Sequence, residues 1–134
     1  MESFNEKSLL PSPFNQFEKW FDVAKNEPSI KIPEAMALST IDLNGYPDSR
    51  MVLLKSFDEK GFTFFTNYQS AKGKSIQKTP KGALLFYWMP LGKMVRIKGD
   101  FEKIKSEEAD LYFSTRPRES QIGAWASQQS DVLI

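Results

Sequence analysis

Hydrophobic and polar residues recur along the chain with two different periods, which distinguish helices from strands. The helical period covers residues 12–26. Its apolar positions are Phe14, Phe17, Trp20, Phe21 and Ala24. Ser12 suits the N-cap and Pro13 suits the first helical position. The pattern predicts a helix that packs one aromatic face on a core.

Short apolar or alternating runs predict strands at residues 35–41, 48–57 and 62–66. Asn44-Gly45 is a typical two-residue hairpin turn, because both residue types tolerate a positive φ. The segment Asp-Glu-Lys-Gly at 58–61 indicates a second tight turn. The three strands should therefore form an antiparallel meander.

The middle of the chain predicts a short basic helix at residues 70–79, with Ser70 as its cap, followed by strands at 82–88 and 93–104. In 93–104, apolar positions alternate with polar ones, so one side of that strand should face the core.

The tail carries local helix signals. Ser106 before two glutamates favours a helix to about Thr115, and Pro117 fits the start of another helix that runs to about Ser127. Five short antiparallel strands with a helical insert predict a mainly β fold with α, a small antiparallel barrel. We expect one domain over residues 1–134.

The amino-acid composition excludes several kinds of catalytic and metal site. The chain has 134 residues, a formal net charge of +1, no Cys and no His. A Ser-His-Asp triad and a His- or Cys-based zinc site are therefore excluded, and an enzyme of this composition needs a cofactor for its reactive atom. We expect no metal, no nucleic acid and no membrane as partners. The sequence contains no apolar run of membrane-spanning length and no secretory signal, which favours the cytoplasm.

The candidate chemistry begins with Arg-Met-Val-Leu-Leu-Lys at residues 50–55, where a cation stands at each end of an apolar run. Arg50 and Lys55 are an odd number of residues apart, so in a regular strand they point to opposite faces. They could reach one elongated ligand only around the edge or end of the strand, or between subunits. Two solvent-exposed strand ends would explain the same pattern.

Two further clusters follow. Thr66, Ser70 and Lys72 offer hydroxyl groups and a cation at a helix start, which is a typical phosphate-binding combination. Residues 112–130 hold several polar and cationic side chains around Pro117. A corner between two helices, anchored by Trp125, is the alternative interpretation of that segment.

In this order, these segments resemble the pyridoxamine 5'-phosphate oxidase family over about residues 10–130. The most specific match is Ser-Thr-Arg-Pro-Arg-Glu-Ser-Gln-Ile-Gly-Ala-Trp at 114–125, continued by Gln129-Ser130, with Thr115 in place of the family's Ser. The resemblance implies a split β-barrel homodimer that binds FMN at the subunit interface. It also implies oxidation by O₂ of the 4' amine or alcohol of pyridoxamine or pyridoxine 5'-phosphate.

The resemblance also implies site residues. The cofactor-binding set would be Arg50, Met51, Val52, Leu53, Leu54, Lys55, Phe65, Thr66, Ser70, Lys72, Gln129 and Ser130. Within it, Arg50 and Lys72 would bind the flavin phosphate. Lys55 would serve both flavin and substrate and is the expected catalytic residue. The substrate phosphate would be bound by Tyr112, Arg116 and Ser120.

The chain departs from the family pattern at Ala71, where an Arg is usual, and at Met94, where a Gln is usual. The family pattern also extends beyond both ends of this sequence. Three interpretations stay open: a truncated product, a compact homologue that acts on another substrate, or a protein that has lost flavin. The functional alternatives are a non-catalytic flavin or pyridoxal-phosphate binding protein and, disfavoured by the charge, a nucleic-acid binder that uses lysines 72–81.

Overall fold

The computed structural model describes residues 13–65, 70–103, 110–114 and 122–126. Two α-helices and one short 3-10 helix are present in this part of the chain: α1 Pro13–Lys25, α2 Ala71–Lys78 and η2 Met89–Leu91. The strands are β1 Ala35–Ile41, β2 Pro47–Asp58, β3 Gly61–Phe65, β4 Lys81–Trp88, β5 Lys93–Lys103, β6 Asp110–Ser114 and β7 Ile122–Ala126. Both predicted helices before residue 80 and all five predicted strands are confirmed.

The strands form one antiparallel sheet in the order β4-β1-β2-β3-β6-β5-β7. An additional β4–β5 pairing joins the first strand of this order to the sixth and closes a ring of strands. β5 pairs with β7 along residues 93–97 and with β6 along residues 100–103. The predicted antiparallel barrel with flanking helices is therefore confirmed, although the described residues contain seven strands rather than five.

The prediction of a helical tail was wrong for the residues that the structure describes. Asp110–Ser114 is a strand between β3 and β5, and Ile122–Ala126 is a strand that pairs with the first half of β5. The expected helix starts at Ser106 and Pro117 lie outside the described residues. The local start signals were outweighed by non-local pairing, because β5 offers backbone donors and acceptors along its length.

The first hairpin turn is longer than the sequence suggested. Asp42 N donates to Tyr46 O at 2.8 Å and Gly45 N donates to Asp42 O at 3.0 Å, so three residues form the loop instead of two. Gly45 has a φ of 87°, which suits the left-handed position that ends such a loop. The second turn is as tight as predicted, since Asp58 pairs with Gly61.

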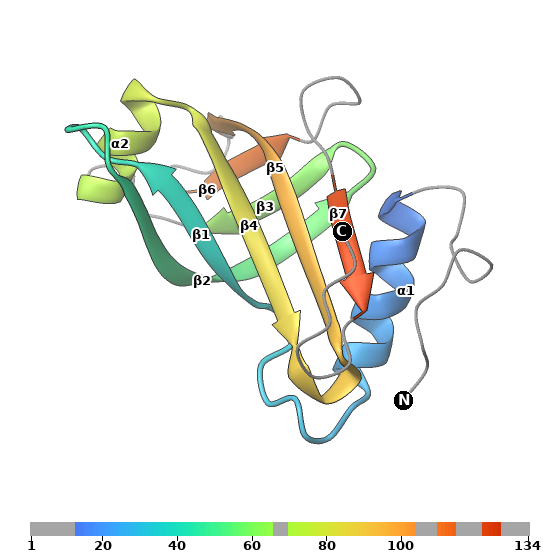
Figure 1. Cartoon of the computed structure of the whole chain (residues 1–134). Coiled ribbons are helices and arrows are strands. Elements are labelled where there is room, and N and C mark those ends of the chain that lie inside the picture. The colour runs from blue at the N-terminus through green and yellow to red at the C-terminus, as the bar shows by residue number, and fades with distance from the viewer. Residues whose placement is uncertain (1–12, 66–69, 104–109, 115–121, 127–134) are drawn as a thin grey trace.

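The two α-helices lie on opposite sides of the barrel (Figure 1). α1 contributes Phe17, Trp20 and Ala24 to the core, and Phe17 is only 1% exposed. Its ring lies 4.9–6.0 Å from the rings of Phe21, Phe57, Phe62, Phe86 and Trp88. α1 therefore fills the barrel from one side. Two of the predicted cations, Arg50 and Lys72, lie on the side near α2.

Candidate functional site

Arg50 lies on the inward face of β2. Exposure alternates along this strand, with Arg50 and Val52 half-buried and Leu54 buried. Met51 and Leu53, which point the other way, are 66% and 56% exposed. β1 pairs with this half of the strand, placing Leu38 opposite Arg50. The guanidinium is thus held at the end of the barrel interior rather than in open solvent.

Two side chains hold the Arg50 guanidinium through one nitrogen. Nη2 donates to Thr40 Oγ1 at 3.2 Å and to the carboxylate of Asp48 at 2.8 Å. Nη1 is buried and has no hydrogen-bond partner among the residues that the structure describes. Buried donors in folded proteins almost always have an acceptor. The geometry therefore indicates an acceptor from outside these residues.

Helix α2 is fixed beside this position. Ser70 caps it, its hydroxyl accepting from Gly73 N at 3.1 Å, as predicted. Ser75 and Ile76 are buried on the barrel side of the helix. At its other end Lys78 Nζ donates to the Leu43 carbonyl at 3.0 Å, which ties α2 to the β1–β2 hairpin. The helix N-terminus, with its partial positive charge, is thereby held in place.

Lys72 lies in the first turn of α2, where the charge of Arg50 affects its pKa. Partial burial, and next the positive charge of Arg50, lower the pKa of Lys72 from its ordinary value. A lysine in the first turn of a helix, close enough to an arginine to be affected by its charge, suits an anion, because an anion would pair with both charges. We call Arg50, Lys72 and the N-terminus of α2 the cation site.

Lys55 lies apart from the cation site, at a break in the β2–β3 ladder. The pairing shifts register between Leu54 and Ser56, which makes Lys55 part of a β-bulge. Lys55 is exposed, as are Met51 and Leu53 before it, whereas Arg50 is not. The predicted placement of the two cations on opposite faces agrees with these exposures. After the bulge, Phe57 returns to the core side.

The other predicted site residues are placed in part. Phe65 is the last residue of β3, and Tyr112 lies in β6, opposite Thr63 and Glu102, instead of in a helix. The remaining ones lie outside the described residues: Thr66, Arg116, Ser120, Gln129 and Ser130. Among the described residues no cluster of three or more acidic side chains could hold a metal ion, and no helix is long and apolar enough to cross a bilayer.

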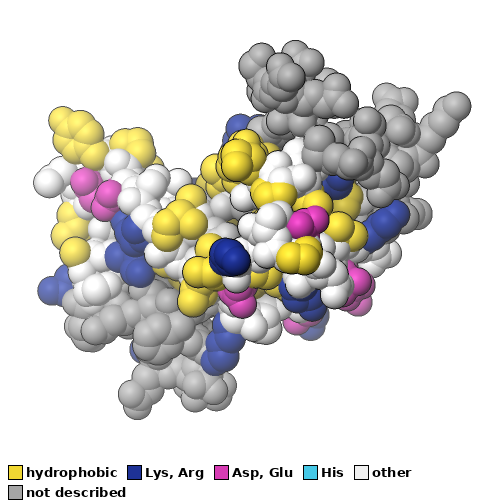
Figure 2. Space-filling model, turned by 90° about the horizontal axis from the view of Figure 1, so that it is seen from below, with side chains coloured by type: hydrophobic (Ala, Val, Ile, Leu, Met, Phe, Trp, Pro, Cys, Tyr) yellow, Lys and Arg dark blue, Asp and Glu magenta, His cyan; other side chains and the backbone are white. Residues whose placement is uncertain are grey.

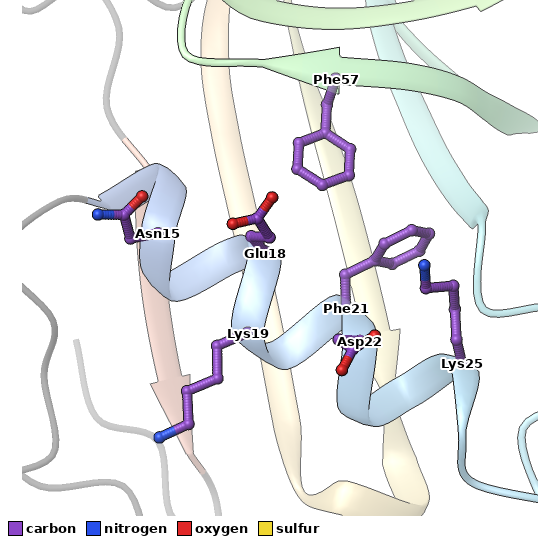
Figure 3. Close-up of a pocket in the computed structure, with 7 residues that line it drawn as sticks. All are labelled: Asn15, Glu18, Lys19, Phe21, Asp22, Lys25 and Phe57. Atoms are coloured by element: carbon purple, nitrogen blue, oxygen red, sulfur yellow. The ribbon is translucent and has the colours of Figure 1, made fainter.

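An open groove of about 650 Å³ lies elsewhere, between α1 and β2 (Figure 3). Phe21 and Phe57 both line it, with their rings edge to face and the ring centroids 5.7 Å apart, while Lys19 points away from Phe57. None of the predicted site residues lines this groove. The cation site is therefore not part of this groove.

Thr40 and Asp48 were missed by the sequence analysis. Thr40 is the last inward-facing residue of β1 and is 1% exposed. The alternation along this strand predicts an apolar residue at this position, but threonine is polar. Asp48 precedes Arg50 by two residues on the same strand, a spacing that places both on one face. Those two signals could have identified them.

Comparison with known proteins decides the family. Residues 24–134 match the sequence profile of pyridoxamine 5'-phosphate oxidase. The chain belongs to the pyridoxamine 5'-phosphate oxidase family. It is 49% identical over 130 residues to a pyridoxine/pyridoxamine 5'-phosphate oxidase of Cupriavidus necator, and 50% identical over 128 residues to one of Bordetella petrii. Each match covers 96% of this chain and 60% of the relative, so the chain spans about three-fifths of their length.

Two solved structures share this fold. PhzG from Burkholderia lata, in complex with tetrahydrophenazine-1-carboxylic acid, is 26% identical with a TM-score of 0.71. The match covers 78% of this chain and 52% of PhzG. A pyridoxamine 5'-phosphate oxidase-related, FMN-binding protein from Nostoc punctiforme shares the fold, with a TM-score of 0.61 and 24% identity over 75% of this chain and 51% of its own.

The chemistry of the cation site suits an anionic group such as a phosphate. A phosphate group presents several oxygen acceptors, which match the buried Nη1 of Arg50, the ammonium of Lys72 and the backbone N–H groups at the start of α2. Ala71, at the first position of α2, is exposed and adds no charge. In this part of the structure the positive charge therefore comes from one arginine, one lysine and the helix end.

Proposed function

We propose that this chain is an FMN-dependent oxidoreductase that converts pyridoxamine or pyridoxine 5'-phosphate to pyridoxal 5'-phosphate. The amine reaction consumes O₂ and water and releases ammonia and H₂O₂, whereas the alcohol reaction consumes O₂ and releases H₂O₂. The observation that carries the proposal is the cation site, with its buried and unsatisfied Arg50 donor beside Lys72. Family membership supports the reaction class.

FMN would supply the two-electron acceptor on which the oxidation depends. The chain's own contribution is binding and orientation. Arg50, Lys72 and the start of α2 would hold the flavin phosphate by charge-assisted hydrogen bonds. The backbone from Met51 to Leu54 would run along the rest of the cofactor. The β2–β3 pairing covers Leu54–Asp58, so the residues of β2 before Leu54 pair only with β1 among the described strands.

Lys55 would contact both the flavin and the substrate. Its place in the bulge supports this role, because a bulge interrupts the strand pairing and bends the strand locally. For the substrate phosphate, Tyr112, Arg116 and Ser120 remain the expected residues. Orientation of this kind lowers the barrier by holding the reacting atoms close together.

A homodimer is part of the proposal. Met51, Ala37 and Leu85 lie in register across β2, β1 and β4, on the outer side of the barrel. Leu53 and Tyr87, two positions along their strands, extend this row and are 56% and 53% exposed. We call these five residues the outer face. Contiguous exposed apolar surface of this kind is typical of protein interfaces. A second copy on this face would lie beside the proposed cofactor strand.

Nucleic acid is not favoured as a partner. Figure 2 shows Lys and Arg side chains interspersed with Asp, Glu and hydrophobic side chains, without a continuous positive stripe on this face. Together with the net charge of +1, this distribution does not provide the electrostatic footprint that nucleic-acid binding requires.

The proposal is tested in two steps. Titration of the purified protein with FMN should quench flavin fluorescence, and flavin should remain bound after desalting. FMN-loaded protein mixed with pyridoxamine 5'-phosphate and O₂ should then release H₂O₂ at a rate above that of FMN alone. Binding without H₂O₂ would favour the non-catalytic flavin-binding alternative, and absence of flavin binding would exclude both.

A further inference from the structure

The hydrogen bonds of Arg50 divide its guanidinium into two parts. Nη2 carries two N–H groups, and both have acceptors within the fold, Thr40 Oγ1 and the Asp48 carboxylate. Nη1 carries two more N–H groups and is buried without a partner among the described residues. Because the guanidinium is planar and rigid, fixing one nitrogen fixes the direction of the other.

From this geometry we infer that Thr40 is a positioning residue, which together with Asp48 orients Arg50 so that Nη1 is presented to the phosphate of the ligand. This inference rests on the proposed function, since it takes the flavin phosphate as the ligand of the cation site. Neither Thr40 nor Asp48 needs to touch the ligand for this role.

The two acceptors are held differently. Thr40 is 1% exposed on the inward face of β1, and its register partner on β2 is Asp48. The Asp48 side chain is 59% exposed, so its ion pair with Arg50 is screened by water and weak by itself. The buried hydroxyl of Thr40 is therefore the firmer of the two restraints on the guanidinium.

A purely structural role for Thr40 can be distinguished from a positioning role by comparing ligands with and without a phosphate. If the buried hydroxyl only stabilised the core, its removal would weaken the binding of every ligand equally. A hydroxyl that acts through Arg50 should matter only for ligands with a phosphate. FMN and riboflavin share the same ring system and differ in that group, so together they separate the two roles.

The experiment measures FMN and riboflavin affinity by fluorescence quenching for the wild type, Thr40→Val and Thr40→Ser. Valine keeps the shape of threonine and removes the acceptor, so FMN binding should weaken by about 3- to 10-fold, the loss expected for one ordinary hydrogen bond while Asp48 still holds Arg50. Riboflavin binding should stay within about twofold of the wild type. Serine keeps the hydroxyl and should restore FMN binding. Thr40→Ala provides a second variant without the acceptor if valine disturbs the packing.

A double-mutant cycle identifies Arg50 as the residue through which Thr40 acts. In an Arg50→Met background, Thr40→Val should cause no further loss of FMN affinity. Unchanged FMN affinity in Thr40→Val, or an equal loss for riboflavin, would overturn the positioning role while leaving the proposed function intact. A wild type that binds neither FMN nor riboflavin would overturn the proposed function instead.

Discussion

At the scale of single residues, Arg50 and Lys72 were predicted, whereas Thr40 and Asp48, which hold Arg50, were not. The sequence indicates cations at a strand and at a helix start, and the structure brings them within electrostatic reach of each other. Which acceptors hold Arg50 depends on the β1–β2 register, which places Thr40 opposite Asp48. The sequence alone does not define that register, because the predicted two-residue turn differs from the three-residue loop observed.

The charge of Arg50 should dominate phosphate recognition. Arg50→Met removes the guanidinium donors and leaves a long apolar side chain in their place. FMN affinity should therefore fall by about 10- to 150-fold, equivalent to about 1.5–3 kcal/mol. Lys60→Met, in the exposed β2–β3 turn, changes the net charge equally and should leave the affinity within about twofold. Fluorescence titration measures both variants, and equal losses would show that only the overall charge matters.

The pH dependence of FMN binding should report Lys72. The pKa of Lys72 in the free protein lies below the ordinary 10.5, and a bound phosphate would raise it again. The affinity for FMN should therefore be highest at neutral pH, where Lys72 is charged. It should fall as the pH rises from the pKa of Lys72 in the free protein to its pKa in the complex. Lys72→Arg keeps its charge throughout this range, so its alkaline loss should be smaller. The same alkaline loss in both proteins would contradict this assignment.

At the scale of elements, strands and helices with a clear local period were predicted, and the tail was not. The aromatic face of α1 and the meander from β1 to β3 follow from local spacing. β6 and β7 exist because β3 and β5 provide pairing partners distant in the sequence. The bulge at Lys55 has the same kind of origin, since it is defined by the shift in register with β3.

The contribution of α1 should be measurable through Phe17. Its ring is buried against five other aromatic rings, so Phe17→Ala should lower the free energy of unfolding by about 3–5 kcal/mol. Val23→Ala, at a 43% exposed position of the same helix, should change it by about 0.5 kcal/mol or less. Denaturant unfolding gives both values. A similar small change in both variants would show that α1 is not packed as described.

At the scale of the whole molecule, the barrel buries its inner side and exposes the outer face. Composition indicated this arrangement in general terms, because the chain contains 11 Phe and 3 Trp and needs either a large core or an apolar interface. The structure shows that the described phenylalanines lie mainly in the core or against it. The exposed residues of the outer face are instead Met51, Leu53 and Tyr87.

The outer face should mediate self-association. Leu53→Lys places a charge on this face and should shift the protein from dimer to monomer, because an unpaired charge in an interface is costly. Ile32→Lys, at a 55% exposed position before β1, should leave the dimer intact. Light scattering coupled to size exclusion distinguishes these states. A monomeric wild type would refute the proposed dimer.

The central claim, that the cation site binds the flavin phosphate, is tested most directly by comparing FMN with riboflavin on the wild-type protein. Both ligands are titrated under identical conditions, with quenching of flavin fluorescence as the signal. The account predicts saturable FMN binding and riboflavin binding that is about tenfold weaker or more, because riboflavin lacks the phosphate. Equal affinities for the two ligands, or no binding of FMN, would contradict it.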